Sequence, residues 1–354
     1  MTIGYFGNYN SSHPRNKIFL KCLAAAGFNV VEINHREPGL RKYISLISEL
    51  RARRNEMDAL MVGFPGQQAM IIANFFFRKP IIFNALLSLY DAVISDRKRY
   101  GRFSFRALYF WLLDYIAFRL PDVLLFDCNA YIDYAVKEFD VARSKCKRIF
   151  LGADEGVFQP LDIPEKPLEI HYYGSFIPTH GVDTIVKAAK ILENEGIRFI
   201  LSGHGQCYAD TLKLAKELSV KNVEFIDRLA NTAELNEFIN SSWITLGIFG
   251  QRPRTDRIIA SKVFEALQCG KVVITSRTSA GKELLEDNQS ALFVKPNDEN
   301  DLAEKILALK RDESLRRQIA VGGKEQYDSK SSMKVIIRHL QDVMKIDESH
   351  FLIQ

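Results

Sequence analysis

The sequence predicts an α/β protein of two doubly wound domains, each a parallel sheet with helices on both faces. Short apolar runs alternate with segments of mixed apolar and charged character over the first 150 residues. The same alternation restarts at Leu168, after a stretch rich in proline and glycine. Strand–helix alternation at this spacing favours right-handed β-α-β units, and 354 residues are enough for two cores.

The first domain is expected over residues 1–150. Its predicted strands are Thr2–Phe6, Asn29–Ile33, Asp58–Gly63, Pro80–Asn84, Val123–Phe126 and Cys146–Phe150. Its predicted helices are Arg15–Ala26, Arg41–Arg54, Gln67–Phe77 and Ala130–Phe139. Each helix carries an apolar and a charged face, as expected for the cover of a sheet.

Residues 151–167 break this rhythm and are interpreted as an interdomain linker. The segment has no periodic apolar pattern and contains Gly152, Gly156, Pro160, Pro164 and Pro167. Glycine and proline at this density are typical of irregular chain.

The second domain is expected over residues 168–330. Its predicted strands are Leu168–Tyr173, Ile197–Ser202, Val223–Ile226, Trp243–Phe249, Lys271–Thr275 and Ala291–Val294. Its predicted helices are Val182–Glu195, Tyr208–Leu218, Ala233–Ser241, Ile258–Cys269, Ser279–Glu286 and Asn300–Lys310. The last 40 or so residues are expected to form two more helices, and residues 331–354 to pack back on the first domain. Ligands of such sheets bind beyond the carboxyl ends of the strands.

Cysteine usage and hydropathy predict a cytoplasmic protein. The five cysteines are scattered without a C-x-x-C pair, which argues against a zinc site or a disulfide framework. The chain opens directly on a strand-like run, so no signal peptide is expected. The most apolar region, 107–126, is interrupted by charged residues and a proline, so no membrane span is expected.

The net charge of +5 is unevenly distributed. Residues 1–150 hold 22 lysines and arginines against 13 aspartates and glutamates, and the remainder holds 26 against 30. A basic first domain is typical of a protein that faces an anionic surface or ligand. Solvated helix faces explain the same charge equally well.

Two glycine loops follow predicted strands of the second domain. The first runs from Gly174 to Gly181, just before a helix, and contains His180. The second is Gly203-His204-Gly205, which lacks the third glycine of the dinucleotide fingerprint. Glycine lets the backbone approach a ligand, and a helix amino terminus attracts anions. A plain strand–helix turn is the alternative for the first loop; the second alone is a weak signal.

The segment 250–270 carries the strongest candidate site. Arg252, Arg254 and Arg257 precede a predicted helix whose first turns bring Ser261, Lys262 and Glu265. Arginine forks, a lysine and a helix start suit a diphosphate, and a carboxylate one turn further suits the two hydroxyls of a ribose. The alternatives are a solvated charge run and an i, i+3 surface pair.

Taken together, these motifs resemble the retaining glycosyltransferases of family 4. The resemblance rests on Gly174–Gly181, Gly203-His204-Gly205, the block Phe264–Val273, the tail Phe293–Asp298 and the linker segment Gly152–Pro160. It implies the GT-B architecture, with two Rossmann-like domains facing across a cleft. It also implies transfer of a sugar, with retention of configuration, from a nucleotide-diphosphate sugar in the second domain. UDP or GDP is favoured over ADP, and neither a metal nor another cofactor is expected.

The sequence departs from the family pattern at three positions. Ser175 and His180 stand where the family places an arginine and a lysine, and Arg257 stands where it places the first of two glutamates. We therefore expect Lys262, Arg257 and His180 to act on the leaving diphosphate. The expected donor contacts are Gly7, Gly174, Ser175, Phe176, His180, Gly203, His204, Gly205, Arg228, Phe249, Arg252, Ile258, Ala260, Ser261, Lys262 and Glu265.

The resemblance assigns the acceptor to the first domain. His13 and Arg15 follow the first predicted strand, and Asp91 follows the fourth. All three are candidate acceptor contacts. A surface turn for His13 and a helix cap for Asp91 are the competing interpretations.

Basic and aromatic residues interleave in 75–79 and 97–111. This composition suits an anionic membrane surface, single-stranded nucleic acid, or core aromatics flanked by solvated arginines. With the family in view we expect a lipid-linked acceptor glycan, peripheral attachment to the inner face of the cell membrane, and no nucleic acid. The rival functions are a non-catalytic nucleotide-sugar-binding scaffold and a transferase for a soluble acceptor.

Overall fold

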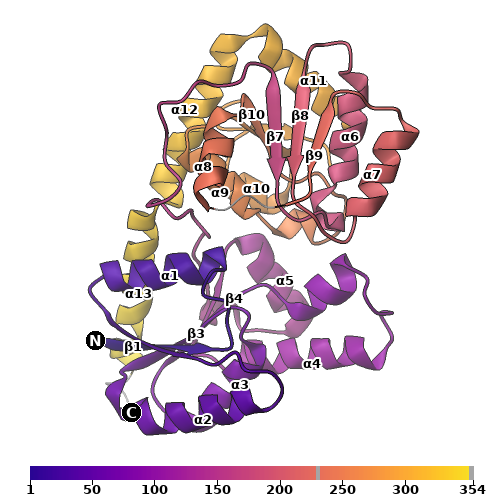
Figure 1. Ribbon diagram of the computed structural model, residues 1–354. Helices are drawn as coiled ribbons and strands as arrows, with labels where there is room; N and C mark the ends of the chain where they lie inside the picture. Colours follow the sequence, from indigo (N-terminus) through magenta and orange to yellow (C-terminus); the bar gives the residue numbers. More distant parts are fainter. Residues whose placement is uncertain (229–231, 351–354) are drawn as a thin grey trace. The chain divides into compact units, whose positions relative to one another are not determined.

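The computed structural model describes residues 1–228 and 232–350 (Figure 1). The chain forms two compact units. Unit 1 is Met1–Leu151 together with the chain from Met333 onward, and unit 2 is Gly152–Ser332. Each unit is a parallel six-stranded sheet with helices, which confirms the predicted α/β class of two doubly wound domains.

The sheet of unit 1 has the strand order β2-β1-β3-β4-β5-β6. Its strands are β1 (Thr2–Gly7), β2 (Asn29–Asn34), β3 (Ala59–Val62), β4 (Ile81–Leu86), β5 (Val123–Phe126) and β6 (Cys146–Arg148). Strand order reverses at β1, where Tyr5 pairs with Glu32 of β2 and with Met61 of β3. The carboxyl end of β1, and with it the loop after Gly7, therefore lies at the switch point of this sheet.

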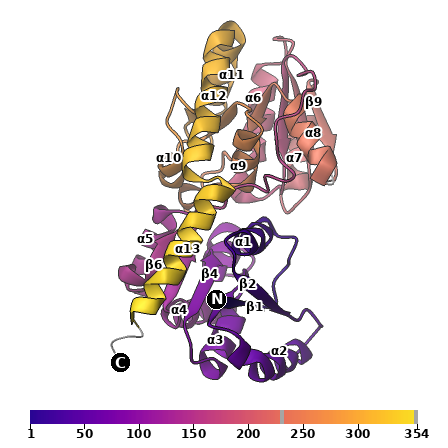
Figure 2. The same ribbon diagram turned by 90° about the vertical axis from the view of Figure 1, so that its left-hand side faces the viewer.

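Nine helical segments accompany this sheet within the described residues. They are α1 (Pro14–Ala25), α2 (Arg41–Arg53), η1 (Arg54–Glu56), α3 (Gln67–Phe76), the π-helix η2 (Asp91–Asp96), α4 (Phe105–Arg119), α5 (Asn129–Phe139), η3 (Arg143–Lys145) and α13 (Met333–His350). Helix α13 lies beside α1 (Figure 2), and Gln341 donates a hydrogen bond to the carbonyl of Ala26 at 3.4 Å. The last helix of the chain thus belongs to unit 1.

Helix α4 has no counterpart among the predicted helices. Its sequence is apolar almost all round, so it lacks the periodicity that reveals a surface helix. Ser104 caps it by accepting a hydrogen bond from the amide of Ala107 at 3.2 Å.

The sheet of unit 2 has the order β12-β11-β10-β7-β8-β9. Its strands are β7 (Glu169–Tyr173), β8 (Arg198–Ser202), β9 (Val223–Ile226), β10 (Ile244–Leu246), β11 (Val273–Ser276) and β12 (Leu292–Val294). Its helices are η4 (Pro178–His180), α6 (Val182–Ile191), α7 (Tyr208–Glu217), α8 (Thr232–Ser241), η5 (Thr255–Arg257), α9 (Ser261–Gln268), α10 (Ser279–Leu284), α11 (Glu299–Arg311) and α12 (Glu313–Lys330).

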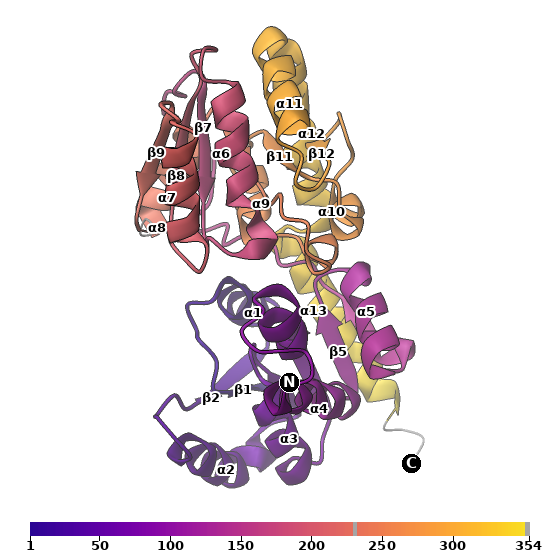
Figure 3. The same ribbon diagram turned by 90° about the vertical axis from the view of Figure 1, so that its right-hand side faces the viewer.

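Opposite faces of this sheet are covered by different helices. Tyr172 belongs to the core cluster with residues of α6, α7 and α11, which Figure 3 shows together. Its neighbour Tyr173 hydrogen-bonds to residues of α9, which packs with α12. Successive side chains of a strand point to opposite faces, so α9 covers the face opposite to α6.

The predicted start of α9 is wrong by three residues. Residues 255–257 form η5, Ile258 is extended, and the helix begins at Ser261. Ile258 and Ala260 therefore lie in the approach to the helix. The predicted strand 243–249 is also too long, since β10 ends at Leu246.

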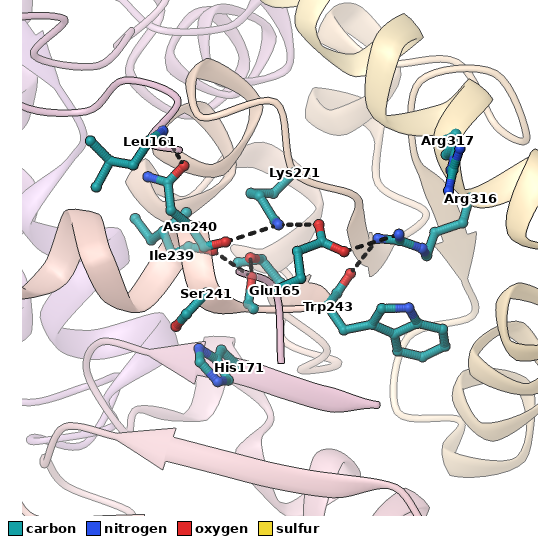
Figure 4. A network of polar contacts seen from close by, with 12 residues as sticks. Leu161, Glu165, His171, Ile239, Asn240, Ser241, Trp243, Lys271, Arg316 and Arg317 are labelled. Carbon is teal, nitrogen blue, oxygen red and sulfur yellow. Dashed lines mark hydrogen bonds and ion pairs between the residues drawn. The ribbon is translucent and has the colours of Figure 1, made fainter. Parts of the chain in front are cut away.

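A network of charges at the amino ends of the strands secures unit 2 (Figure 4). Lys271, just before β11, donates to Glu165 and to the carbonyl of Asn240. Arg316 of α12 reaches the same Glu165 at 3.0 Å and the carbonyl of Trp243 at 3.3 Å. Because Lys271 and Arg316 share the Glu165 carboxylate, the network links α8, α12 and the segment before β7. The opposite ends of the strands carry the candidate site.

Candidate functional site

The glycine loops of unit 2 meet at the carboxyl ends of β7 and β8. The Gly174 amide donates to the carbonyl of Ser202 at 2.9 Å, and the Gly203 amide donates to the carbonyl of Ile226 at 2.9 Å. A β-carbon on Gly203 would lie 2.0 Å from the Gly174 carbonyl oxygen, and its φ of +132° disfavours side chains. Glycine is therefore required where the two loops approach each other.

Further backbone contacts fix the loop from Gly174 to Gly181. The Phe176 amide donates to the carbonyl of His204 at 3.0 Å, and the Phe249 amide donates to the carbonyl of His180 at 2.9 Å. The side chains of Phe176 and Phe249 are fully buried in the core, so any donor contact must use their backbone. Ser175, His204 and Gly205, in contrast, are exposed on these loops.

A buried lysine lies behind the first loop. The Nζ of Lys262, in the first turn of α9, lies 3.7 Å from the ring centroid of Tyr172 and 3.4 Å from Nδ1 of His180. Burial lowers the pKa of Lys262 well below its ordinary value, and the nearby Glu265 carboxylate opposes this only in part. A β-carbon on Gly174 would lie 3.1 Å from Nζ, so this glycine leaves room for the ammonium group.

Tyr172 also holds the histidine of this loop. Its hydroxyl donates to the Ser175 carbonyl at 2.9 Å and lies 2.8 Å from Nδ1 of His180. With its proton on the carbonyl, the hydroxyl accepts from Nδ1–H, which leaves Nε2 of the neutral ring without a proton. A protonated imidazolium would present Nε2–H to an anion instead.

Glu265 is oriented by Tyr173, the last residue of β7. The Tyr173 hydroxyl lies 2.7 Å from Oε2 of Glu265 and 3.2 Å from the carbonyl oxygen of Lys262. Burial raises the pKa of Glu265 to about 7, with the Tyr173 hydrogen bond, Lys262 and Ser261 pulling the other way. The carboxyl group is thus near half-ionised at neutral pH. Neither tyrosine was predicted as a site residue, although two hydroxyl-bearing aromatics directly before the loop glycine Gly174 are a signal in the sequence.

Three arginines were also expected to contact the donor. Arg252 is half-buried and lines a cavity of about 480 Å³ with Pro178, Asp183 and Cys207. Arg257 ends η5 and is half-buried. Arg228 is exposed and forms a 3.0 Å ion pair with Glu234.

Two candidate residues of unit 1 are interior residues. Arg15 is fully buried; it donates to Asn84 Oδ1 and to the carbonyl of Ile149, both at 2.7 Å. Asp91 is also fully buried and accepts from the Tyr131 hydroxyl at 2.9 Å. Neither side chain reaches the surface, which contradicts their expected contact with an acceptor. The side chains of Arg15 and Asp91 form hydrogen bonds inside unit 1, because each lies on the inward face of its helix.

His13 is half-buried in the loop between β1 and α1. It is the N-cap of α1, and its Nδ1 accepts from the amide of Arg15 at 3.3 Å. Its ring packs on Phe64 with centroids 4.9 Å apart. Burial and the adjacent Arg15 lower its pKa to about 4, so it is neutral at physiological pH. Gly7, with a φ of +148°, ends β1 at the switch point.

Within 1–228 and 232–350, no three His, Cys, Asp or Glu side chains gather in a way that could hold a metal ion. No helix in this same portion is both long and apolar enough to cross a membrane.

Part of the chain is similar in sequence to glycosyltransferases. Residues 154–326 match the family described as "Glycosyl transferases group 1". An uncharacterized glycosyltransferase of Methanocaldococcus jannaschii is 27% identical over 44% of this chain and 41% of its own. An N-acetyl-alpha-D-glucosaminyl L-malate synthase of Bacillus anthracis is 23% identical over 53% of this chain and 49% of its own. The matches thus span less than half the length of these relatives.

Solved structures share the fold over the whole chain at 14% identity. HepE of Anabaena, in complex with UDP, has a TM-score of 0.73, and the match covers 98% of this chain and 100% of HepE. Sucrose-phosphate synthase of Thermosynechococcus elongatus has a TM-score of 0.79, covering 99% and 100%. These likenesses show the GT-B fold that the sequence predicts, and residues 154–326 carry the similarity to glycosyl transferases group 1.

Proposed function

We propose that this protein transfers a sugar from a nucleotide-diphosphate sugar to an acceptor glycan, with retention of configuration. The observation that carries the proposal is the pairing of Lys262 and Glu265 in the first turns of α9, beside the glycine loops. A cation and a carboxylate one helical turn apart suit the diphosphate and the ribose of one nucleotide.

The donor occupies the carboxyl ends of β7, β8 and β10 in this proposal. Backbone amides of the loops at Gly174 and Gly203 and the start of α9 face the diphosphate. An anionic diphosphate would favour the charged form of Lys262, which burial disfavours. Arg252 and Arg257 add positive charge at the rim. Stabilising the departing diphosphate is then the main catalytic effect.

The nucleotide is UDP or GDP in preference to ADP. HepE, which shares the fold, was solved with UDP and with UDP-glucose. The acceptor is a lipid-linked glycan, and the protein works peripherally on the inner face of the cell membrane. A Campylobacter jejuni relative, 28% identical over 37% of this chain and 34% of its own, bears a name that specifies a PP-undecaprenol-linked glycan.

The test is a thermal-shift screen with UDP-, GDP- and ADP-sugars, followed by an assay of nucleotide-diphosphate release. We expect one donor to raise the midpoint of unfolding and to release nucleotide slowly, with acceleration by a lipid-linked acceptor. Absence of any shift with every donor would contradict the proposal.

A non-catalytic sugar-nucleotide-binding protein is the second candidate. It is favoured by the departures from the family pattern, since Ser175 is exposed without charge and Lys262 is held against Tyr172. Donor binding without nucleotide release, whatever the acceptor, would identify it. A soluble acceptor that accelerates release as well as a lipid-linked one would instead identify a transferase for small molecules.

A further inference from the structure

The outward face of α4 in unit 1 is apolar, although it faces solvent. The residues of this helix that are exposed by more than a third are Phe105, Arg106, Leu108, Tyr109, Leu112 and Ile116. All except Arg106 are apolar or aromatic, and their spacing of three or four residues places them on one side of the helix. Figure 1 shows α4 at an edge of unit 1. An exposed apolar face of this kind marks a site of interaction with a partner.

The turn before this helix extends the same surface. Phe103 is 98% exposed and Phe105 is 93% exposed, so two whole phenyl rings stand in water. Full exposure of one ring costs about 1.5–3 kcal/mol relative to its burial. We call the surface formed by Phe103, Phe105, Leu108, Tyr109, Leu112 and Ile116 the α4 face.

Positive charge surrounds the α4 face without a compensating negative charge. Lys98, Arg99, Arg102 and Arg106 are exposed, and none of the four forms an ion pair with a residue in the described ranges. Arg106 lies over the ring of Tyr100, with 4.5 Å to the centroid. The sequence from 97 to 113 contains no aspartate or glutamate. The partner must therefore be apolar and bear negative charge at its surface.

We propose that the α4 face inserts into the interfacial layer of an anionic lipid bilayer. Exposed phenyl rings, a tyrosine and aliphatic side chains would enter the headgroup–acyl boundary, while the four cations would contact lipid phosphates. A second copy of this chain is disfavoured, because an isologous contact would bring two sets of four cations together. Nucleic acid is disfavoured, because three of the six side chains of the face, Leu108, Leu112 and Ile116, are aliphatic and cannot stack on bases.

This contact rests on the peripheral attachment in the proposed function and names the surface that makes it. Flotation is measured without donor or acceptor, so its outcome is separate from that of sugar transfer. Purified protein is floated with phosphatidylcholine vesicles that contain or lack phosphatidylglycerol, at low and at high salt. Binding is expected only to the anionic vesicles and to weaken with salt. The variant Phe103→Ser/Phe105→Ser should lose at least about tenfold in partitioning, and Arg102→Gln/Arg106→Gln about tenfold, at roughly 1 kcal/mol or more per side chain.

The matched control is Ile191→Ser/Val321→Ser, which removes two exposed apolar side chains from unit 2 (48% and 59% exposed). It should float like the unchanged protein. All variants are first compared by thermal unfolding and by UDP-induced thermal shift, which separate loss of folding or of donor binding from loss of membrane binding.

Equal flotation of the Phe103/Phe105 variant and the control would overturn the proposal, as would equal recovery with both kinds of vesicle. Concentration-dependent dimerisation that the Phe103/Phe105 variant abolishes would overturn it in favour of a second copy. Binding of a single-stranded oligonucleotide that competes with vesicles and fails in the same variant would overturn it in favour of nucleic acid.

Discussion

The hydroxyl of Tyr173 lies 2.7 Å from Oε2 of Glu265 and joins the end of the central strand β7 to α9. The bond holds one oxygen of a buried carboxyl group, which also accepts a hydrogen bond from the side chain of Ser261. It also favours the ionised form of Glu265, against the burial that raises its pKa. In the proposed function this tyrosine positions the ribose-binding carboxylate without touching the donor itself.

Replacing Tyr173 with Phe should weaken donor binding about 10- to 150-fold. The change removes a hydrogen bond to a charged acceptor, which is worth about 1.5–3 kcal/mol when the acceptor is buried. It should also move the pH dependence of binding to higher pH, because Glu265 loses a group that favours ionisation. Isothermal titration with UDP or GDP at several pH values measures both effects.

Tyr327→Phe is the control for this variant. Tyr327 of α12 is also buried in unit 2, and its hydroxyl donates to Glu155, in the segment before β7, at 3.0 Å. Similar losses of stability with a loss of affinity only in Tyr173→Phe would support the positioning role. Equal affinities of the two variants would exclude it.

Donor affinity should rise between about pH 6 and pH 8. The pKa of Glu265 is about 7, and the ionised carboxylate is the form that accepts from two ribose hydroxyls. The variant Glu265→Gln should bind the donor weakly and lose this pH dependence. A pH profile of affinity that survives in Glu265→Gln would show that another group controls binding.

The same carboxyl group should make stability fall with rising pH, whereas it makes donor affinity rise. Its folded pKa, about 7, lies above its ordinary value of 4.5, so the native state holds more protons between these values. The free energy of unfolding therefore falls as pH rises through this window. Glu265→Gln should be more stable than the unchanged protein at pH 8, on the order of 1–3 kcal/mol, and no more stable at pH 4.5. Denaturant unfolding at both pH values tests this.

Lys262→Met should stabilise the protein in the absence of donor and weaken its binding of nucleotide diphosphate. Burial lowers the pKa of Lys262, so the native state holds fewer protons than the unfolded chain, and at neutral pH the lysine reduces stability. We expect a gain of about 1–3 kcal/mol, seen as a midpoint higher by a few degrees, together with at least about tenfold weaker binding of nucleotide diphosphate. Unchanged donor binding in this variant would contradict the proposed role.

Lys271→Met is the matched comparison, because it also removes a buried lysine of unit 2. Lys271 donates to Glu165 and Asn240 in the network of Figure 4. Its loss leaves Glu165 with a single cation partner, Arg316. We expect destabilisation of about 1–3 kcal/mol with donor affinity retained, the reverse of Lys262→Met. A stabilising Lys271→Met would refute this distinction between the two ends of the sheet.

The sequence predicted the architecture well because both units follow regular alternation. It placed Val123–Phe126 and Val223–Ile226 to the residue, since a buried parallel strand is a short apolar run with clear boundaries. It did not detect α4, whose solvent face is as apolar as its core face. The start of α9 was misplaced because the apolar run 258–260 leads directly into the helix, yet Ile258 and Ala260 are extended.

The candidate site was predicted in part. Gly174, Gly203 and Lys262 could be brought together from strand ends and a helix start alone. The roles of Tyr172 and Tyr173 depend on which face of β7 each one uses, and this emerges only from the packing of α6 and α9. Arg15 and Asp91 were misassigned because polar residues after strands serve interior hydrogen bonds as readily as ligands.

A nucleotide-sugar site at α9 is tested by titration of UDP, GDP and ADP into the unchanged protein, Glu265→Ala and Tyr327→Phe. We expect UDP or GDP to bind in the micromolar range, Glu265→Ala to lose at least about tenfold in affinity, and Tyr327→Phe to bind normally. Failure of all three nucleotides to bind, or unchanged binding by Glu265→Ala, would contradict a nucleotide-sugar site at α9.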